Sequence, residues 1–357
     1  MFIFDAHLDL SMNAMEWNRD LRQPLKAIRQ REKNLHDKPD RSKNTVCFPE
    51  MHRGDIGLCT ATLIARYSKP KSTLPGWSSP EQAWAQIQGQ LAWYKEMERQ
   101  GHLRSILTGD QVEKHVADWI HHDPEFKPIG YVLSLEGADS VVSPDHLEIL
   151  FKQGLRAIGL SHYGMGVHAA GTDSESKLTP KGRDLIKKVQ DLGIILDATH
   201  LSDKSFYDAM ERFSGPVWAS HHLCRTITPH NRQLNDDQIK TLIERNAVIG
   251  MALDAWMIIP NWIRGYSTPK NKRLKLDNLV DHVCHIAWLA GDTKNIMIGS
   301  DLDGAFGYEQ TPQEVKSIAD LQKLGDALTK RNFTDEDIEG IFYKNGVEFL
   351  KRNLPEG

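Results

Sequence analysis

The sequence predicts a protein of the α/β class, built as a closed (β/α)8 TIM barrel with a polar insertion after strand 1 and a helical C-terminal extension. Three observations lead to this prediction. Short apolar runs recur along the chain, segments with helical periodicity separate them, and the 357 residues exceed the roughly 250 that such a barrel requires.

Eight apolar runs, each closed by a polar cluster, are the predicted strands: 2–10, 57–66, 130–135, 155–160, 194–197, 217–220, 248–253 and 296–298. The predicted helices between them cover 80–100, 144–153, 180–192, 203–212, 236–246 and 277–289. Some begin at start signals such as Ser79-Pro80 and Thr179-Pro180. Continuous apolar strands that alternate with helices are typical of a covered parallel sheet, and eight such units favour a closed barrel over an open sheet.

Three further segments are assigned around this barrel. Residues 18–53 form the polar insertion, and residues 256–275 form an irregular segment broken by Pro260, Gly265 and Pro269. The stretch from residue 311 onward is expected to contain two helices, the last of which starts at Thr334-Asp335-Glu336. Because no repeat or low-complexity linker interrupts the chain, residues 1–357 are expected to form a single domain.

Composition excludes several classes of protein. Lys and Arg total 44 against 48 Asp and Glu, a formal net charge of −4 without long blocks of like charge, so a nucleic-acid partner is not expected. No run approaches the ~20 apolar residues that span a bilayer, and no signal-peptide pattern follows Met1, so we expect neither export nor a membrane anchor. The 4 cysteines are far apart and suggest no disulfide framework, which favours a cytoplasmic location.

Six of the eight predicted strands end in histidine, aspartate or glutamate. These residues are His7, Asp9, Glu136, His162, His200, His221 and Asp301. The carboxyl ends of the strands meet at one face of such a barrel, where active sites are built. Each residue alone has a structural explanation, such as a helix cap or a hydrogen-bonded core histidine. Burying all of them at one barrel mouth would be costly without compensating positive charge, which indicates a divalent metal site.

This ligand set predicts two zinc ions, or similar divalent cations. One catalytic zinc ion typically takes three protein ligands and a water molecule, too few for the residues present. We assign His7, Asp9 and Glu136 to one ion, and Glu136, His200 and His221 to the other, with Glu136 as the bridge. A water molecule held between two such cations is nucleophilic near neutral pH, and the cations polarise the carbonyl group that it attacks. The pattern therefore indicates a hydrolase.

Six motifs in order carry a resemblance to a known family: Asp5-Ala6-His7-Leu8-Asp9, Glu136-Gly137, Ser161-His162, His200-Leu201-Ser202, Ser220-His221 and Gly299-Ser300-Asp301-Leu302-Asp303-Gly304. In order and spacing they resemble the membrane (renal) dipeptidase family, binuclear zinc metallopeptidases of the amidohydrolase-like barrel group. The resemblance covers residues 4 to about 350. It implies hydrolysis of the amide bond of dipeptides, including those with a D-residue at the C-terminal position.

The resemblance also implies roles for three residues. Asp301 would carry the proton from the attacking water to the leaving amine, His162 would stabilise the tetrahedral oxyanion, and Arg232 would bind the C-terminal carboxylate of the substrate. Arg225 is a competitor for Arg232, because Gln233 stands where the family commonly has asparagine. The asparagine and aromatic residues that usually follow strand seven are not evident in residues 250–256, so the sequence predicts no substrate preference.

Two alternatives to a dipeptidase remain. Another binuclear amidohydrolase would act on a cyclic amide or a lactone, or as a deaminase, but such enzymes usually carry H-x-H on strand one, whereas this chain has His7-x-Asp9. A non-catalytic binding barrel is disfavoured because every proposed ligand and Asp301 are present. The aromatic residues of segment 256–265 fit either a lid over a dipeptide pocket or a contact between two copies in a homodimer.

Overall fold

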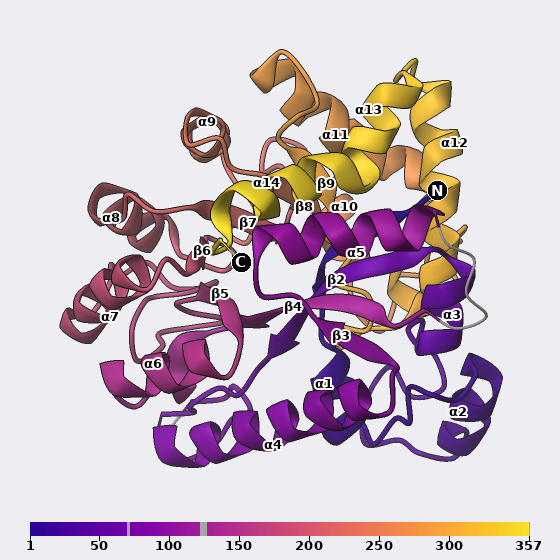
Figure 1. Cartoon of the computed structure of the whole chain (residues 1–357). Helices are drawn as coiled ribbons and strands as arrows, with labels where there is room; N and C mark the ends of the chain where they lie inside the picture. The colour runs from indigo at the N-terminus through magenta and orange to yellow at the C-terminus, as the bar shows by residue number, and fades with distance from the viewer. Residues whose placement is uncertain (70–71, 122–126, 357) are drawn as a thin grey trace.

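Parallel strands form a closed barrel at the centre of the computed structural model, which describes residues 1–69, 72–121 and 127–356 (Figure 1). The barrel strands are β1 Ile3–Leu8, β2 Ile56–Leu63, β4 Ile129–Leu135, β5 Leu155–Gly159, β6 Ile195–Asp197, β7 Val217–His222, β8 Ile249–Met251 and β9 Ile296–Ile298. Neighbouring strands run in the order β2-β1-β9-β8-β7-β6-β5-β4, and pairing of β2 with β4 closes the ring. The predicted barrel and its eight strands are confirmed, with bounds shifted by a few residues.

One additional strand, β3 Leu103–Ser105, was not predicted from the sequence. It pairs in parallel with the start of β4, where Leu103 faces Ile129, and within the described chain it pairs with no other strand. Three residues are too short to give a period-two signal, which explains why the sequence pattern missed it.

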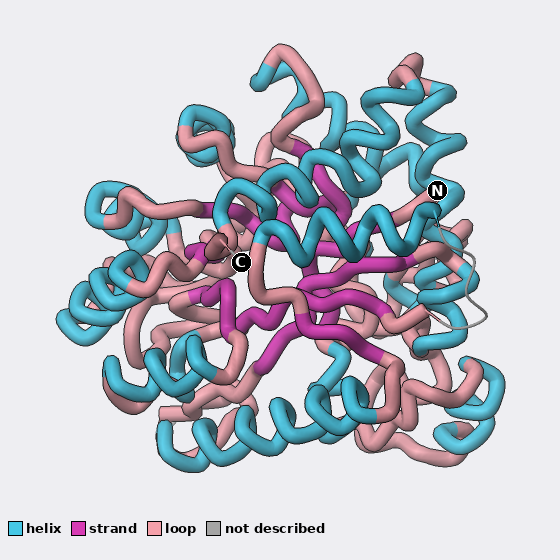
Figure 2. Tube along the Cα trace, in the orientation of Figure 1, coloured by secondary structure: helices cyan, strands magenta, loops and turns pink. Residues whose placement is uncertain are grey.

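Helices surround the strands, as the cyan segments of Figure 2 show. They are α1 Leu10–Met15, α2 Leu25–Glu32, α3 Phe48–Arg53, α4 Pro80–Arg99, α5 Gly109–His121, α6 Pro144–Lys152, α7 Pro180–Asp191, α8 Asp203–Arg212, α9 Asp236–Glu244, α10 Ala255–Ile258, α11 Leu276–Ala290, α12 Lys323–Lys330, α13 Asp335–Glu339 and α14 Asn345–Asn353. The six predicted helices correspond to α4, α6, α7, α8, α9 and α11. The predicted caps are confirmed in part: Ser79 and Thr179 accept hydrogen bonds from the backbone of Gln82 and Gly182. Among the described helices, none has the length and hydropathy that a membrane crossing would require.

The insertion after β1 differs from a simple polar loop. It carries α2 and α3, and four of its charged residues, Arg19, Glu32, Asp40 and Arg41, are buried. The buried Arg19 guanidinium lies 2.9 Å from a carboxylate oxygen of Glu32 and 2.9 Å from one of Asp40, and 3.9 Å from Asp303 beyond β9. Mutual pairing allows these charges to be buried, so the insertion packs against the mouth of the barrel instead of projecting into solvent.

The C-terminal extension also contains more helix than the two helices expected. Thr334 caps α13 as predicted, but α13 continues through a π-helical segment, Gly340–Lys344, into α14. Figure 1 shows α14 and α5 side by side across one end of the barrel, and the Phe349 ring of α14 stacks on Trp218 near the start of β7 at a centroid distance of 5.6 Å. These helices cover the barrel near the start of β7, and the polar residues gather at the opposite, carboxyl ends of the strands.

Two glycines allow β7, β8 and β9 to approach closely. A Cβ atom on either Gly250 or Gly299 would lie 1.8 Å from the carbonyl oxygen of Ser220, which no side chain tolerates. The absence of side chains at these positions brings the end of β7, with His221, next to the turn after β9, with Asp301.

Candidate metal centre

The strand-end residues singled out from the sequence meet at one place. His7 and His221 lie near the ends of β1 and β7, and the others lie in the segments directly after β1, β4, β5, β6 and β9. A cavity of about 180 Å³ opens beside them, and its lining includes Asp9, Glu136, His162, His200, His221, Arg232 and Asp301. His7 lies behind this wall, with its Nε2 atom 3.6 Å from Glu136 Oε2.

Glu136 stands between two groups of ligand-type side chains. Its Oε2 atom faces His7 Nε2 at 3.6 Å, and its Oε1 atom faces His200 Nε2 at 3.3 Å and His221 Nε2 at 3.6 Å. Asp9 Oδ1 lies 3.7 Å from the same nitrogen of His7. The two carboxylate oxygens of Glu136 therefore point at different sets of donors, which is the arrangement that a bridging ligand requires.

Hydroxyl groups form hydrogen bonds with the histidine ring nitrogens that point away from this cluster. Thr172 Oγ1 lies 3.1 Å from His200 Nδ1, and Ser220 Oγ lies 3.0 Å from His221 Nδ1. Such contacts orient the rings and leave Nε2 as the atom that faces Glu136.

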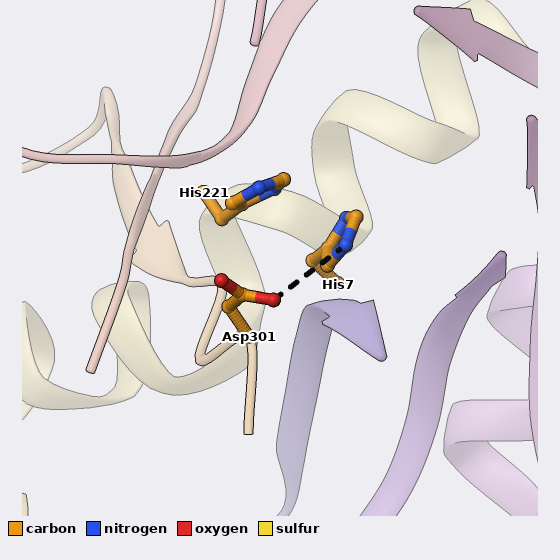
Figure 3. Close-up of side chains that lie close together, drawn as sticks. All are labelled: His7, His221 and Asp301. Atoms are coloured by element: carbon orange, nitrogen blue, oxygen red, sulfur yellow. Dashed lines mark ion pairs between the residues drawn. The ribbon is translucent and has the colours of Figure 1, made fainter. Parts of the chain in front are cut away.

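The spacing of these donors fits a metal ion. Ligand atoms placed tetrahedrally at about 2.0–2.2 Å from zinc are about 3.3–3.6 Å apart. Separations of this size occur here, with 3.3 Å between His200 Nε2 and Glu136 Oε1 and 3.6 Å between His7 Nε2 and Glu136 Oε2. Figure 3 shows His7, His221 and Asp301 converging on a common point. His7 Nε2 is buried without a hydrogen-bond partner among the described residues, and a bound cation would satisfy it.

The electrostatics of the protein alone also favour added positive charge. Burial disfavours the charged form of His7, but Glu136, Asp9 and Asp301 outweigh burial and raise its pKa to about 10. Burial, together with Arg232, holds the pKa of His200 well below its usual range, which keeps it in the neutral form that binds metals. Burial, reinforced by Asp9 and Glu136, raises the pKa of Asp301 well above its usual value, so this carboxyl group readily holds a proton.

Unusual backbone conformations occur at two of these residues. His200 and Asp301 have φ values of 67° and 57°, in the left-handed region that side chains other than glycine rarely adopt. Glu136 is followed by Gly137 with φ 79°, where glycine permits the turn at little cost. Strain of this kind persists where the surrounding structure holds a residue in place, as it does at many active sites.

Two buried aspartates that the sequence reasoning did not single out tie neighbouring strand ends together. Asp5 Oδ1 accepts hydrogen bonds from the backbone of His7, at 3.2 Å, and of Ser300, at 2.8 Å. Asp197 Oδ1 does the same for Thr199, at 3.0 Å, and Ser220, at 3.1 Å. Each lies two residues before a backbone amide that it fixes, a spacing that the sequence contains but that is common in ordinary turns.

Of the two arginines considered for substrate binding, the structure places Arg232 on the cavity. Its side chain is buried, and Nη2 donates to the carbonyl oxygen of His221 at 2.9 Å. The buried side chain of His222, the residue after His221, has its Nδ1 atom 3.3 Å from Nη1 of Arg232. Arg225 lies off the cavity lining and pairs with Asp203 at 2.7 Å.

Further cavity residues were not singled out from the sequence. Arg66 follows β2, and Tyr163 is adjacent to His162. From the segment after β8, Asp254, Trp256, Met257 and Arg264 line the cavity as well. Part of segment 256–275 thus forms a wall of the pocket. Arg66 ends the predicted strand 57–66, so the strand-end rule could have found it had arginine been included among the polar residues.

Comparison with known proteins gives the family. The profile of the membrane dipeptidase family, peptidase family M19, matches residues 1–353. The chain belongs to this family. Members of the family include a metallopeptidase of known structure, the dipeptidase AC, whose fold superposes on 99% of this chain and 99% of its own with a TM-score of 0.80 at 22% identity. A metallopeptidase from Rhodobacter sphaeroides, solved with a phosphinate mimic of the dipeptide L-Ala-D-Ala, gives a TM-score of 0.76 at 20% identity, with 99% of both chains covered.

Two curated relatives match this chain over about half of their own length. Dipeptidase tcpJ of Claviceps purpurea is 26% identical over 233 residues, which cover 62% of this chain and 51% of the relative. The uncharacterized dipeptidase C965.12 of Schizosaccharomyces pombe is 28% identical over 235 residues, covering 63% and 53%. The chain thus spans about half the length of these relatives.

Proposed function

We propose that this protein is a zinc-dependent dipeptidase that hydrolyses the amide bond of dipeptides. The observation that carries the proposal is the position of Glu136, with Oε2 turned to His7 and Oε1 turned to His200 and His221 on one cavity. Membership of the dipeptidase family agrees with it. In this proposal His7, Asp9 and Glu136 hold one zinc ion, and Glu136, His200 and His221 hold the second.

Bound there, the two ions would lower the pKa of a water molecule between them and polarise the substrate carbonyl. Asp301 lies 3.9 Å from His7 Nε2 and on the cavity wall. In this proposal it accepts a proton from that water and delivers it to the leaving amine. Burial is the main cause that raises the pKa of Asp301 well above its usual value, which favours the protonated form of this carboxyl group.

In this proposal His162 stabilises the oxyanion. Arg66 Nη2 donates to its Nδ1 atom, so in the neutral ring the proton lies on Nε2, the nitrogen that faces the cluster at 3.6 Å from Glu136. Burial lowers the pKa of His162 to about 3, so the ring is a neutral hydrogen-bond donor at working pH.

Arg232 supplies the selectivity for a free C-terminus. Its guanidinium is buried on the cavity and has no carboxylate within 4 Å in the described part of the chain, so the substrate's own carboxylate would pair with it. This need for an anion favours a peptidase over a lactonase or a deaminase. Because the Rhodobacter relative was solved with a mimic of L-Ala-D-Ala, we propose that D-residues are accepted at the C-terminal position here too.

The test is a joint measurement of metal content and hydrolysis. Protein purified from metal-replete medium should contain about two equivalents of zinc and should hydrolyse members of a dipeptide library with L- and D-residues at the second position. Chelation should abolish hydrolysis, and added zinc should restore it. Metal content near zero, or metal-loaded protein that cleaves no dipeptide, would reject the proposal.

A further inference from the structure

Two arginines on the wall of the cavity lack an acidic partner. Among the three guanidinium groups that line it, Arg264 pairs with Asp254 at 2.9 Å. Neither Arg232 nor Arg66 has a carboxylate within 4 Å among the residues that the structure describes. Unpaired cations in a partly desolvated site are unfavourable unless an anion joins them.

Arg66 makes only partial use of its hydrogen-bonding groups. It follows β2, and its Nη1 atom donates to the carbonyl oxygen of Pro75 at 3.2 Å, while Nη2 contacts His162. Its Nε atom is buried and has no hydrogen-bond partner within the described residues. Burial lowers the pKa of Arg66, as expected for a cation that loses hydration without gaining an ion pair.

The acidic residue with the largest influence on Arg66 is Glu136, followed by Asp139. In the proposed function Glu136 is shared by two cations, and its charge is then no longer available to Arg66. Asp139 is engaged elsewhere, because it accepts backbone hydrogen bonds from Tyr67 and Val167. With the metal site filled, exposed Glu16 is the acidic group that still acts on Arg66, so Arg66 faces the cavity with little compensating negative charge.

A dipeptide brings one main-chain carboxylate, and Arg232 takes it in the proposed function. The guanidinium of Arg66 remains without an anionic partner, and a second anion on the substrate would pair with it. We propose that Arg66 binds a carboxylate on a substrate side chain, so that dipeptides containing aspartate or glutamate are preferred over their amide counterparts. This inference rests on the proposed function and names the substrate class of the same site.

The experiment uses matched pairs of dipeptides, Ala-Asp with Ala-Asn and Asp-Ala with Asn-Ala, with both L- and D-residues at the second position. A hydrogen-bonded, charged pair contributes about 1.5–3 kcal/mol, so the metal-loaded protein should favour one acidic peptide over its amide by roughly 10- to 100-fold in kcat/KM. The pair that shows the preference identifies which residue of the substrate Arg66 contacts.

Variants at position 66 test the assignment. Arg66→Gln should remove the preference, and Arg66→Lys should keep part of it, because a lysine retains the charge but not the planar fork. Arg264→Gln is the matched control, since that guanidinium already has Asp254, and should leave the ratio within about twofold of the parent protein. If Arg66 acted only by orienting His162, Arg66→Gln would lower kcat for all peptides alike and leave the ratio unchanged, which would overturn the proposal.

Calorimetric titration separates this inference from the proposed function. The acidic and amide peptides are titrated into metal-loaded Asp301→Asn protein, with and without Arg66→Gln. Binding that favours the acidic peptide and depends on Arg66 supports the anion site even if the parent protein hydrolyses nothing. Hydrolysis of neutral dipeptides together with equal affinity for the acidic and amide peptides rejects the anion site and leaves the dipeptidase proposal standing.

Discussion

At the scale of single residues, the rule that parallel strands end on one face was enough to predict which side chains meet. His7 and His200 are 193 positions apart in the sequence. Their Nε2 atoms nevertheless lie 3.6 Å and 3.3 Å from the carboxylate of Glu136. The rule could not predict Asp5 or Asp197, because these carboxylates act on backbone amides two residues ahead, and that spacing is frequent in turns without function.

Asp301 is the residue whose proposed role can be tested most directly. Asp301→Asn keeps the size and hydrogen-bonding capacity of the side chain but cannot exchange a proton. We expect turnover to fall by roughly 10²-fold or more, the scale of general acid-base catalysis. Metal analysis of the same preparation should still find the zinc content of the parent protein. Turnover close to that of the parent protein, with metal bound, would remove Asp301 from the mechanism.

At the scale of elements, strands and regular helices were predictable, but the packing of the insertion was not. From composition alone, residues 18–53 were predicted only to be a polar insertion. The structure instead buries Arg19 between Glu32 and Asp40, and Asn13 extends the network by donating to the carbonyl oxygens of Asp9 and Asp303 at 3.0 Å each. Pairing between charges far apart in sequence leaves no periodic signal, so composition could not distinguish a buried network from a surface.

The network predicts a large cost when its cation is removed. Arg19→Met keeps much of the volume of the side chain but leaves Glu32 and Asp40 buried with less compensating charge. We expect a loss of about 3–5 kcal/mol in the free energy of unfolding, measured by urea titration. The matched control is Arg22→Met, which breaks an exposed pair with Asp20 and should cost less than about 1 kcal/mol. Equal effects of the two substitutions would show that burial of the network contributes nothing.

At the scale of the whole molecule, the count of eight strand-helix units was enough to predict that the barrel closes. The elements outside that repeat could not be predicted from the sequence. The short β3 and the helix α5 lie between β2 and β4, where a regular barrel has a single helix. The π-helical turn between α13 and α14 contacts β1 and β9, and contacts between segments so far apart in the chain leave no signal in the local sequence. What the repeat did predict is that the proposed ligands come from strands all around the ring.

This distribution couples metal binding to the stability of the entire barrel. His7, Glu136, His200 and His221 belong to β1, β4, β6 and β7 or to the segments after them, so the site exists only when the ring is closed. A ligand that binds only the folded chain adds about 1.4 kcal/mol of stability per tenfold rise in its free concentration once its site is saturated. Two ions should therefore give about twice that slope when urea unfolding is followed in zinc-buffered solutions. Glu136→Gln, which weakens the shared ligand, should lower the stabilisation at a given free zinc concentration and move the start of the slope to higher zinc. The Arg22→Met protein should keep the zinc dependence of the parent protein. An unfolding free energy that is the same in excess chelator and in excess zinc would mean that the folded barrel holds no cation, and a slope of half the expected size would mean that it holds one.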